Sequence, residues 1–391
     1  MQQFTEPRER LLLGAGPSNV SPRVIRAMTL PLMGYLDPTF LKVMDEVTAL
    51  LRQMFRTSNE FTLAVSGTGT SGMEASLVNM LEPGDTAVIG THGLFGQRLA
   101  DIASRCGANV ITVPAEWGQT LDPAAIEQAL KDAGQVKLLA VVHVETSTGV
   151  VQPLASLAEL AHNHNALFLV DAVTSLGGVD LRVDEWGLDI CYSATQKCVG
   201  SPPGLSPITL SPRAVDVLRQ RQTPVQSFYL DLLQLERYWL TDRVYHHTAS
   251  MSNIYALREA LIIAMEEGLE ARYERHQRNA DALKAGLATF GMQPLASKGS
   301  QANPLTAALV PDGIDEARVR RSLLGEYGIE IGGGFGPLAG KIWRIGLMGE
   351  SSQARHVLTL LHALETLLAR EGLEIAAGSS LSAAHQVLAA E

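Results

Sequence analysis

The sequence predicts an α/β protein built around a mainly parallel β-sheet, with a smaller domain after it. Short apolar runs alternate with longer stretches of helical periodicity through the first two thirds of the chain, which is typical of strands linked by crossover helices. These runs are apolar throughout, so the strands are expected to be covered on both faces. In such a sheet, ligands bind at the carboxyl ends of the strands.

The individual elements follow in order along the chain. Strands are expected in six runs rich in branched apolar residues, at 61–67, 85–90, 108–114, 137–144, 166–173 and 189–194. Helices are expected in the intervening segments, at 71–83, 93–107, 122–134 and 153–165.

The last third of the chain shows a different pattern. Helical periodicity begins near Ile254 and continues to about 291, which is too long for one ordinary helix. We place a domain boundary at its midpoint, Gly268, because strands (305–311, 341–348) and helices (317–328, 354–372) resume beyond it. The predicted division is an N-terminal arm (1–14), a large domain (15–268) and a small α+β domain (269–391). The tail after Gly372 is expected either to form a weak helix or to fray.

Composition excludes several classes of function. A net charge of −10 argues against nucleic-acid and acidic-membrane partners, which require a basic face. The three cysteines, Cys106, Cys191 and Cys198, have neither metal-binding spacing nor the pattern of a disulfide framework, so no metal site is expected and a reducing compartment is favoured. The first residues lack an apolar stretch behind a basic head, and no run is long enough to span a membrane. We therefore expect a cytoplasmic protein.

A glycine-rich segment, GTGTSG at 67–72, follows the first strand and precedes a helix. This pattern occurs in dinucleotide-binding folds, which also need an acidic residue after the next strand. That strand is followed by Thr91 and His92 instead. The alternatives are a tight strand-to-helix turn and a phosphate site formed by the backbone amides of Thr68–Thr70 at a helix N-terminus.

Two charged residues lie at the ligand-binding edge of the predicted sheet. Lys197, in YSATQKCVGSPPG, has no acidic neighbour in sequence, which indicates a partly desolvated amine; a loop lysine whose ammonium group extends to solvent is the alternative. Asp171 ends an apolar strand and therefore needs a cationic partner. A lysine for a Schiff base, a carboxylate for a pyridine nitrogen and amides for a phosphate are the three requirements of pyridoxal 5′-phosphate.

Taken together, the motifs resemble the class V aminotransferases of fold type I, especially the alanine–glyoxylate and serine–pyruvate branch. The resemblance covers nearly the whole chain. Its segments, in order, are LLLGAGPSNVSPRV, SGTGTSGMEASLVN, HVETSTGVVQPL, VDAVTSLGG, YSATQKCVGSPPGLSP, YHHTASMSNIYALREAL and GKIWRIGLMG. It implies a seven-stranded, mainly parallel sheet in the large domain, and a homodimer with shared active sites.

The family pattern, carried over by position, implies a set of cofactor contacts around Lys197 and Asp171. Thr68, Gly69, Thr70 and Gln196 resemble phosphate contacts, and Val173 resembles the residue beneath the ring. Ser147 resembles the residue that binds the ring hydroxyl, with Thr148 as a neighbouring candidate. Tyr245 and Thr248 resemble residues that reach the phosphate in the other subunit.

The pattern also implies substrate contacts. Arg344, in an apolar strand, resembles the clamp for the substrate α-carboxylate; a structural ion pair is the alternative. Gly16, Tyr35 and Ser147 are further candidates for the substrate site. Two positions depart from the family: Phe95 replaces a frequent tryptophan over the ring, and Thr70 replaces a histidine found in some members. Phenylalanine can still stack, so the departures affect ring tilt and substrate preference.

The predicted function is transfer of an amino group from alanine or serine to glyoxylate or pyruvate through a Lys197 Schiff base. The alternatives within the family are serine–glyoxylate, ureidoglycine–glyoxylate and aminoethylphosphonate–pyruvate transaminases. Outside it, a dinucleotide-dependent oxidoreductase and a non-catalytic cofactor-binding protein stay open. One methyl or hydroxyl group changes specificity by only about 1–3 kcal/mol in an apolar pocket, so the donor is not ranked further.

Overall fold

The computed structural model describes residues 8–390, so residues 1–7 of the predicted N-terminal arm lie outside the described residues. The helices are α1 (Pro22–Ala27), α2 (Pro38–Phe55), α3 (Gly69–Met80), α4 (Leu94–Arg105), α5 (Pro123–Ala133), α6 (Ala155–Asn163), α7 (Pro212–Arg219), α8 (Leu232–Trp239), α9 (Met251–Glu267), α10 (Leu269–Ala288), α11 (Glu316–Ser322), α12 (Ala354–Arg370) and α13 (Ser379–Ala389). The strands are β1 (Leu11–Leu12), β2 (Phe61–Ser66), β3 (Thr86–Thr91), β4 (Asn109–Pro114), β5 (Leu138–Val142), β6 (Val144–Glu145), β7 (Val150–Val151), β8 (Leu167–Asp171), β9 (Ile190–Tyr192), β10 (Leu205–Leu210), β11 (Leu305–Leu309), β12 (Ile329–Glu330), β13 (Gly332–Gly333) and β14 (Ile342–Gly346).

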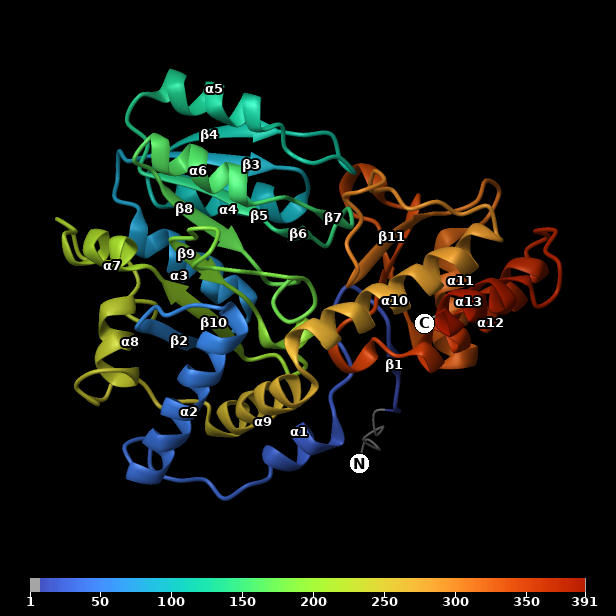
Figure 1. Ribbon diagram of the computed structural model, residues 1–391, viewed down its shortest axis with the longest axis horizontal. Helices are drawn as coiled ribbons and strands as arrows, with labels where there is room; N and C mark the ends of the chain where they lie inside the picture. The colour runs from blue at the N-terminus through green and yellow to red at the C-terminus, as the bar shows by residue number, and fades with distance from the viewer. Residues whose placement is uncertain (1–7, 391) are drawn as a thin grey trace, which may run out of the picture.

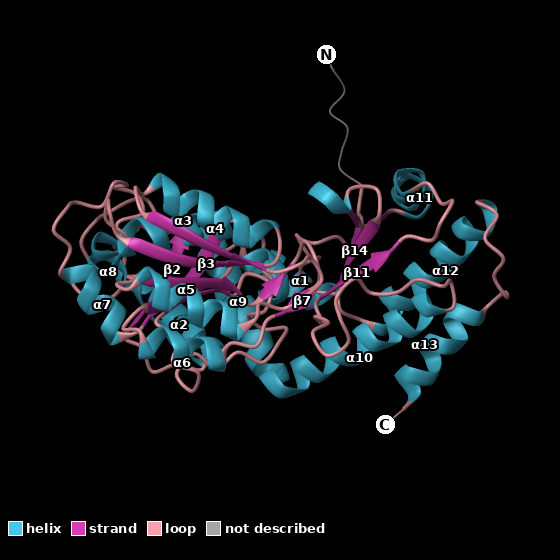
Figure 2. Ribbon diagram, turned by 90° about the horizontal axis from the view of Figure 1, so that it is seen from above, coloured by secondary structure: helices cyan, strands magenta, loops and turns pink. Residues whose placement is uncertain are grey.

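A seven-stranded sheet forms the centre of the larger part of the molecule. Its order is β2-β10-β9-β8-β5-β3-β4, and every strand is parallel to the others except β10, which runs antiparallel to both β2 and β9. Helices α3 and α4 lie on one face, and α2 and α6 lie on the other (Figure 2). The inner strands β5 and β8 are buried along their whole length, as their apolar sequences predict. The predicted fold class is confirmed.

A second hydrophobic core lies toward the C-terminal end of the chain (Figure 1). It is built on the antiparallel sheet β11-β14-β13 and on α10, α12 and α13, and it includes Leu13 and Trp343. Strand β1 reaches this part of the molecule, where it pairs with β12. The tail after Gly372 forms α13, which packs against α10 and α12.

The long helical pattern is two helices that meet at Gly268. This residue has a φ of 82°, a left-handed conformation that glycine adopts without the steric cost of a Cβ. We propose that Gly268 separates the large domain from the small one, because the first core ends at Ala264 and the second begins, beyond this point, at Ala282. Across residues 8–390, we find no helix with the length and apolar character needed to cross a bilayer.

Candidate active site

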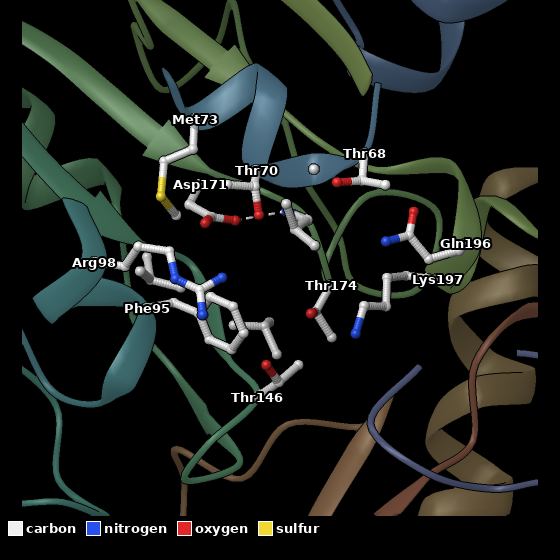
Figure 3. A pocket seen from close by; sticks show the side chains of 14 residues that line it. Thr68, Thr70, Met73, Phe95, Arg98, Thr146, Asp171, Thr174, Gln196 and Lys197 are labelled. Carbon is white, nitrogen blue, oxygen red and sulfur yellow. Dashed lines mark hydrogen bonds between the residues drawn. The ribbon is translucent and has the colours of Figure 1, made fainter. Parts of the chain in front are cut away.

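A cavity opens at the carboxyl-terminal edge of the central sheet, where β2, β8 and β9 end (Figure 3). Parallel strands bring their carboxyl ends to one edge, so segments far apart in sequence meet there. The cavity is lined by Thr68, Gly69, Thr70, Met73, Phe95, Arg98, Val142, Val144, Thr146, Asp171, Val173, Thr174, Gln196 and Lys197. Seven of the residues predicted from sequence to contact a cofactor therefore lie together with Lys197.

Lys197 lies in a wide helical turn, Thr195–Val199, directly after β9. The side chain is only 8% exposed, and its Nζ donates a hydrogen bond to the carbonyl of Ala15. Burial lowers the pKa of Lys197 to about 8, and the charge of Arg344 acts in the same direction, against the opposing effects of Cys198 and Asp171. At pH 7 the amine is thus neutral in about a tenth of the molecules, far more than for an ordinary lysine.

The N-terminal segment closes over this lysine. Gly16 has a φ of 102°, and a Cβ at this position would lie 2.4 Å from Lys197 Nζ, so only glycine fits. Ser18 fixes the segment: its backbone N–H donates to the Gln196 carbonyl at 3.0 Å, and its hydroxyl donates to the Lys197 carbonyl at 3.2 Å. The predicted candidate Gly16 therefore touches the reactive amine.

Asp171 ends β8 and is almost fully buried. Burial raises the pKa of Asp171 to about 6, while two hydrogen bonds to its carboxylate act in the opposite direction. These bonds come from the Tyr192 hydroxyl at 2.6 Å and the Val173 amide at 2.8 Å. The carboxylate is held in one orientation at the cavity wall.

The N-terminus of α3 forms an anion-binding corner of the cavity. Thr68 is the residue before the helix, and its side chain makes no capping hydrogen bond, so its hydroxyl is available to a ligand. Gly69 permits close packing, because a Cβ there would lie 2.9 Å from the Ala194 Cβ. Gln196 lies beside Thr68 (Figure 3), and its buried Oε1 has no hydrogen-bond partner among the described residues. Free amides and a helix N-terminus favour a phosphate or another anion.

Phe95 and Arg98 form a further wall of the cavity, on α4. The Arg98 guanidinium carbon lies 4.8 Å from the centre of the Phe95 ring, and Figure 3 shows both side chains beside Asp171. The predicted ring contact Phe95 is therefore in place. Arg98 was not predicted, although its position three residues after Phe95 on a predicted helix puts both on one face.

Buried Glu145 fixes the start of α4. Its carboxylate accepts hydrogen bonds from the amides of Phe95 at 3.0 Å and Gly96 at 3.2 Å, and from the Ser147 hydroxyl at 2.6 Å. Burial raises the pKa of Glu145, and these hydrogen bonds oppose that effect. Sequence analysis did not single out Glu145, because no pattern shows that it would meet α4.

The structure brings Thr146, rather than the predicted Ser147, into the cavity. The Ser147 hydroxyl is fully buried and already engaged, since it donates to Glu145 and accepts from the Leu94 amide at 2.9 Å. Thr148, the neighbouring candidate, is also fully buried and is not among the lining residues. Thr146 presents its side chain to the cavity (Figure 3), and its neighbours on both sides do not.

Arg344 lies on β14 near the cavity, and it is 7% exposed. Its Nε donates to the Gly333 carbonyl at 2.6 Å, and the Phe335 ring centre lies 4.0 Å from its guanidinium carbon. No carboxylate forms an ion pair with Arg344 within residues 8–390, so the alternative of a structural ion pair has no partner there. Burial lowers the pKa of Arg344 to about 10, and it stays cationic.

Three predicted residues lie elsewhere. Tyr245 is 56% exposed, and its ring centre lies 4.8 Å from that of Tyr35. Thr248 is exposed in the same segment. None of the three lines the cavity of its own chain, and their roles stay predictions.

Comparisons with known proteins agree with this geometry. The family described as aminotransferase class-V matches residues 10–339. The chain is 41% identical to the (S)-ureidoglycine–glyoxylate transaminase of Bacillus subtilis, over 97% of this chain and 95% of that protein. It is 38% identical to the alanine–glyoxylate aminotransferase of Drosophila melanogaster, over 94% of each chain. The solved structure of an alanine–glyoxylate aminotransferase from Nostoc sp. superposes with a TM-score of 0.92 at 47% identity, over 94% of this chain and 97% of that one.

Proposed function

Because the chain belongs to the class V aminotransferases, we propose that it transfers an amino group from alanine or serine to glyoxylate or pyruvate with pyridoxal 5′-phosphate as its cofactor. The observation that carries this proposal is the buried Lys197 amine, which faces a cavity that also holds Asp171 and the N-terminus of α3. A dinucleotide-dependent oxidoreductase is not favoured, since the family match covers the same glycine-rich segment.

The residues around the cavity fit the proposed cofactor. The free hydroxyl of Thr68, the first amides of α3 and the unpartnered Gln196 side chain would hold the phosphate, with Thr70 beside them. Asp171 would pair with the pyridine nitrogen, and Val173 and Phe95 would enclose the ring. Thr146 takes the place of Ser147 as the proposed contact for the ring hydroxyl. When bound, the cofactor supplies an electron sink for the bonds at the substrate α-carbon.

Each proposed role follows from the state of the side chain. Lys197, with a pKa lowered to about 8 by burial, can both accept and release a proton near neutral pH, and we assign it the proton at the substrate α-carbon. Asp171 keeps the pyridine nitrogen protonated through a charged hydrogen bond. Arg344, with no carboxylate of its own, offers its guanidinium to the substrate α-carboxylate.

Glyoxylate is the acceptor that the named relatives support. The names of the Bacillus, Drosophila and Nostoc proteins all contain glyoxylate, whereas the amino donor is (S)-ureidoglycine in one and alanine in the other two. We therefore propose glyoxylate as the main acceptor and alanine as the first donor to test, with serine, (S)-ureidoglycine and aminoethylphosphonate beside it.

We also propose that two copies of the chain form a homodimer. Large apolar side chains are exposed in three segments, of which the first and last meet at the Tyr35–Tyr245 contact: Leu30, Leu32, Tyr35 and Leu36; Phe228 and Tyr229; Val244 and Tyr245. A second copy that covers them would bring Tyr245 and Thr248 within reach of the other subunit's phosphate site.

We also propose a cytoplasmic location. The three cysteines are buried and free, which supports it.

One set of single-turnover measurements tests the function. Purified protein loaded with pyridoxal 5′-phosphate is mixed with each donor, and the loss of cofactor absorbance is followed; the aminated form is then mixed with glyoxylate or pyruvate. We expect alanine or serine to convert the cofactor, and glyoxylate to restore it fastest. Binding of the cofactor without conversion by any donor would refute an aminotransferase, and a faster reaction with (S)-ureidoglycine would reassign the donor. Sedimentation analysis that shows a monomer would refute the dimer.

A further inference from the structure

The two proposed key residues of the site lie on different parts of the molecule. Lys197 follows β9 of the central sheet, whereas Arg344 lies on β14 of the C-terminal sheet. Helix α10 begins beside the first part and runs to the second (Figure 1). Its first two turns carry Arg272, Arg275 and His276, and none of the three lines the active-site cavity.

Arg272 binds the segments that carry Asp171 and Lys197. It is buried, and its Nη2 donates to the Cys198 carbonyl at 2.6 Å, one residue after Lys197. Its Nε donates to the Gly177 carbonyl at 2.9 Å, in the loop that follows Asp171. A planar guanidinium can hold two such carbonyls at once, which the single ammonium of lysine cannot do with the same geometry.

Arg275 and His276 bind the loop that follows the Arg344 strand. Arg275 Nη1 donates to the carbonyls of Ser352 at 2.5 Å and Gly349 at 3.1 Å. The amide of Gly349 donates to His276 Nε2 at 3.0 Å. Burial, together with the charges of both arginines, lowers the pKa of His276 to about 3, so it is neutral and able to accept this bond.

Glu267, the last residue of α9, joins the two ends. Its carboxylate accepts from Arg272 Nη1 at 2.7 Å and from Arg275 Nη2 at 3.0 Å. Burial alone would raise the pKa of Glu267, but the hydrogen bond from Arg275 and the charge of Arg272 bring it below its ordinary value. One carboxylate is therefore shared by two cations, the buried Arg272 and the half-buried Arg275, and it balances one of their two charges.

The two anchored segments also touch each other. Gly349 has a φ of 53°, and a Cβ on it would lie 3.2 Å from the Lys197 carbonyl oxygen and 3.3 Å from the Cys198 carbonyl oxygen. The loop after the Arg344 strand thus packs directly on the backbone of the lysine turn. A change in either anchor would alter how the two fit.

We propose that Glu267, Arg272, Arg275 and His276, here named the α10 clamp, are positioning residues that hold the Lys197 turn and the Arg344 strand in register across the two parts of the molecule. The Arg272 end sets the position of Lys197, and the Arg275 end sets the position of Arg344. The inference rests on the proposed roles of those two residues. It goes beyond them, because it assigns a function to four residues that contact neither cofactor nor substrate.

Two charge-conserving variants test the two ends separately. The protein is loaded with pyridoxal 5′-phosphate, and two quantities are measured. The first is cofactor binding, followed by the dissociation constant of the cofactor and the apparent pKa of its absorbance. The second is the dissociation constant of 2-methylalanine, a substrate analogue that has no α-proton to lose. Arg272→Lys should weaken cofactor binding by about tenfold and shift the absorbance pKa, as expected for loss of one charge-assisted hydrogen bond. The charged groups that face Lys197 in this titration are Arg344 and Asp171, with the Cys198 thiol adjacent. Arg275→Lys should mainly weaken 2-methylalanine binding, also by about tenfold.

Arg278→Lys is the matched control, because Arg278 is exposed on the same helix and should leave both quantities unchanged. If either clamp variant fails to fold, Gly349→Ala tests the contact without removing a charge, and it should shift both quantities together. A fall in thermal midpoint with both quantities unchanged would overturn the proposal and leave the clamp a purely structural cluster. Equal losses in both quantities from Arg272→Lys and Arg275→Lys would overturn the assignment of separate ends. If the wild-type protein does not attach the cofactor at Lys197, the proposed function fails first, and the two failures are thereby distinguished.

Discussion

Tyr192→Phe is expected to raise the pKa of Asp171 by removing one of the two hydrogen bonds that the structure gives to its carboxylate. The Tyr192 hydroxyl donates to Oδ2 at 2.6 Å, and both residues are buried. Phenylalanine keeps the ring and leaves the Val173 amide as the other donor. The variant therefore changes the electrostatics of one carboxylate with little change in packing.

The expected magnitude follows from the worth of a hydrogen bond to a charged group, about 1.5–3 kcal/mol. That energy corresponds to about one to two pH units. Burial already raises the pKa of Asp171 to about 6, so the variant should hold the protonated acid at neutral pH in the cofactor-free protein. Because this pKa lies above the ordinary value of 3.8, Asp171 stabilises the fold below about pH 4, and that contribution is lost as the pH rises through the folded pKa. The stability difference between variant and wild type should therefore grow from pH 5 to pH 8.

Infrared spectroscopy of the cofactor-free protein provides the assay. The carboxylic acid band assigned to Asp171 is the one that Asp171→Asn removes, and its titration gives the pKa directly. Tyr238→Phe is the matched control, since Tyr238 is an equally buried tyrosine whose hydroxyl donates to the Tyr35 carbonyl at 2.9 Å. An unchanged midpoint in Tyr192→Phe, or the same change in Tyr238→Phe, would refute the reasoning.

Three further predictions concern the cavity. Lys197→Ala should abolish amino transfer because no other lysine lines the cavity, and borohydride reduction followed by peptide mapping should label Lys197 alone in the wild type; a label on another lysine would remove the assignment. Arg344→Lys keeps the charge but loses the planar fork, so it should raise KM for both donor and acceptor, at a cost of about 1.5–3 kcal/mol in binding free energy, with little effect on cofactor affinity. An unchanged KM with a lowered thermal midpoint would make Arg344 structural. Thr146→Val should weaken cofactor binding more than Ser147→Ala does, as judged by equilibrium titration, because the structure presents Thr146 to the cavity; the reverse order would restore Ser147.

The elements that the sequence predicted correctly are those with a strong apolar pattern. All six expected strands are present, because uninterrupted branched apolar runs have few other ways to be buried. Strand β10 was missed, since Pro207 within LSPITL argues against an inner strand. The structure accommodates it: the Pro207 carbonyl accepts from the Ser193 amide at 2.8 Å, and the Ser206 hydroxyl donates to the Ser193 carbonyl at 2.5 Å. An apolar pattern carries no information on strand pairing, so it could not predict that β10 runs antiparallel to its neighbours.

The site was predictable to the extent that its residues sit in contiguous motifs at strand ends. Asp171 ends a buried strand, Thr68 and Lys197 lie in the turns shortly after two others, and the fold brings such positions to one edge of the sheet. The partners that set their properties come from elsewhere in the chain. Tyr192 was predicted as a strand residue, but its hydroxyl bond to Asp171 depends on the register between β8 and β9. Thr146 and Ser147 are adjacent in sequence, and the contacts that keep the Ser147 hydroxyl out of the cavity, with Glu145 and the Leu94 amide, come from the fold.

The opposite pKa changes of Lys197 and Asp171 have one cause. Burial disfavours the charged form of both groups, so it lowers the pKa of the amine to about 8 and raises the pKa of the carboxyl to about 6. Because neutral pH lies between these two values, each group is charged in most molecules, and the burial of both charges is a cost to the fold. A ligand with a protonated ring nitrogen and a phosphate would offset that cost, since the first pairs with Asp171 and the second meets the free amides of α3. The same burial that makes Lys197 reactive thus favours the cofactor, and the fold is stabilised when both are satisfied.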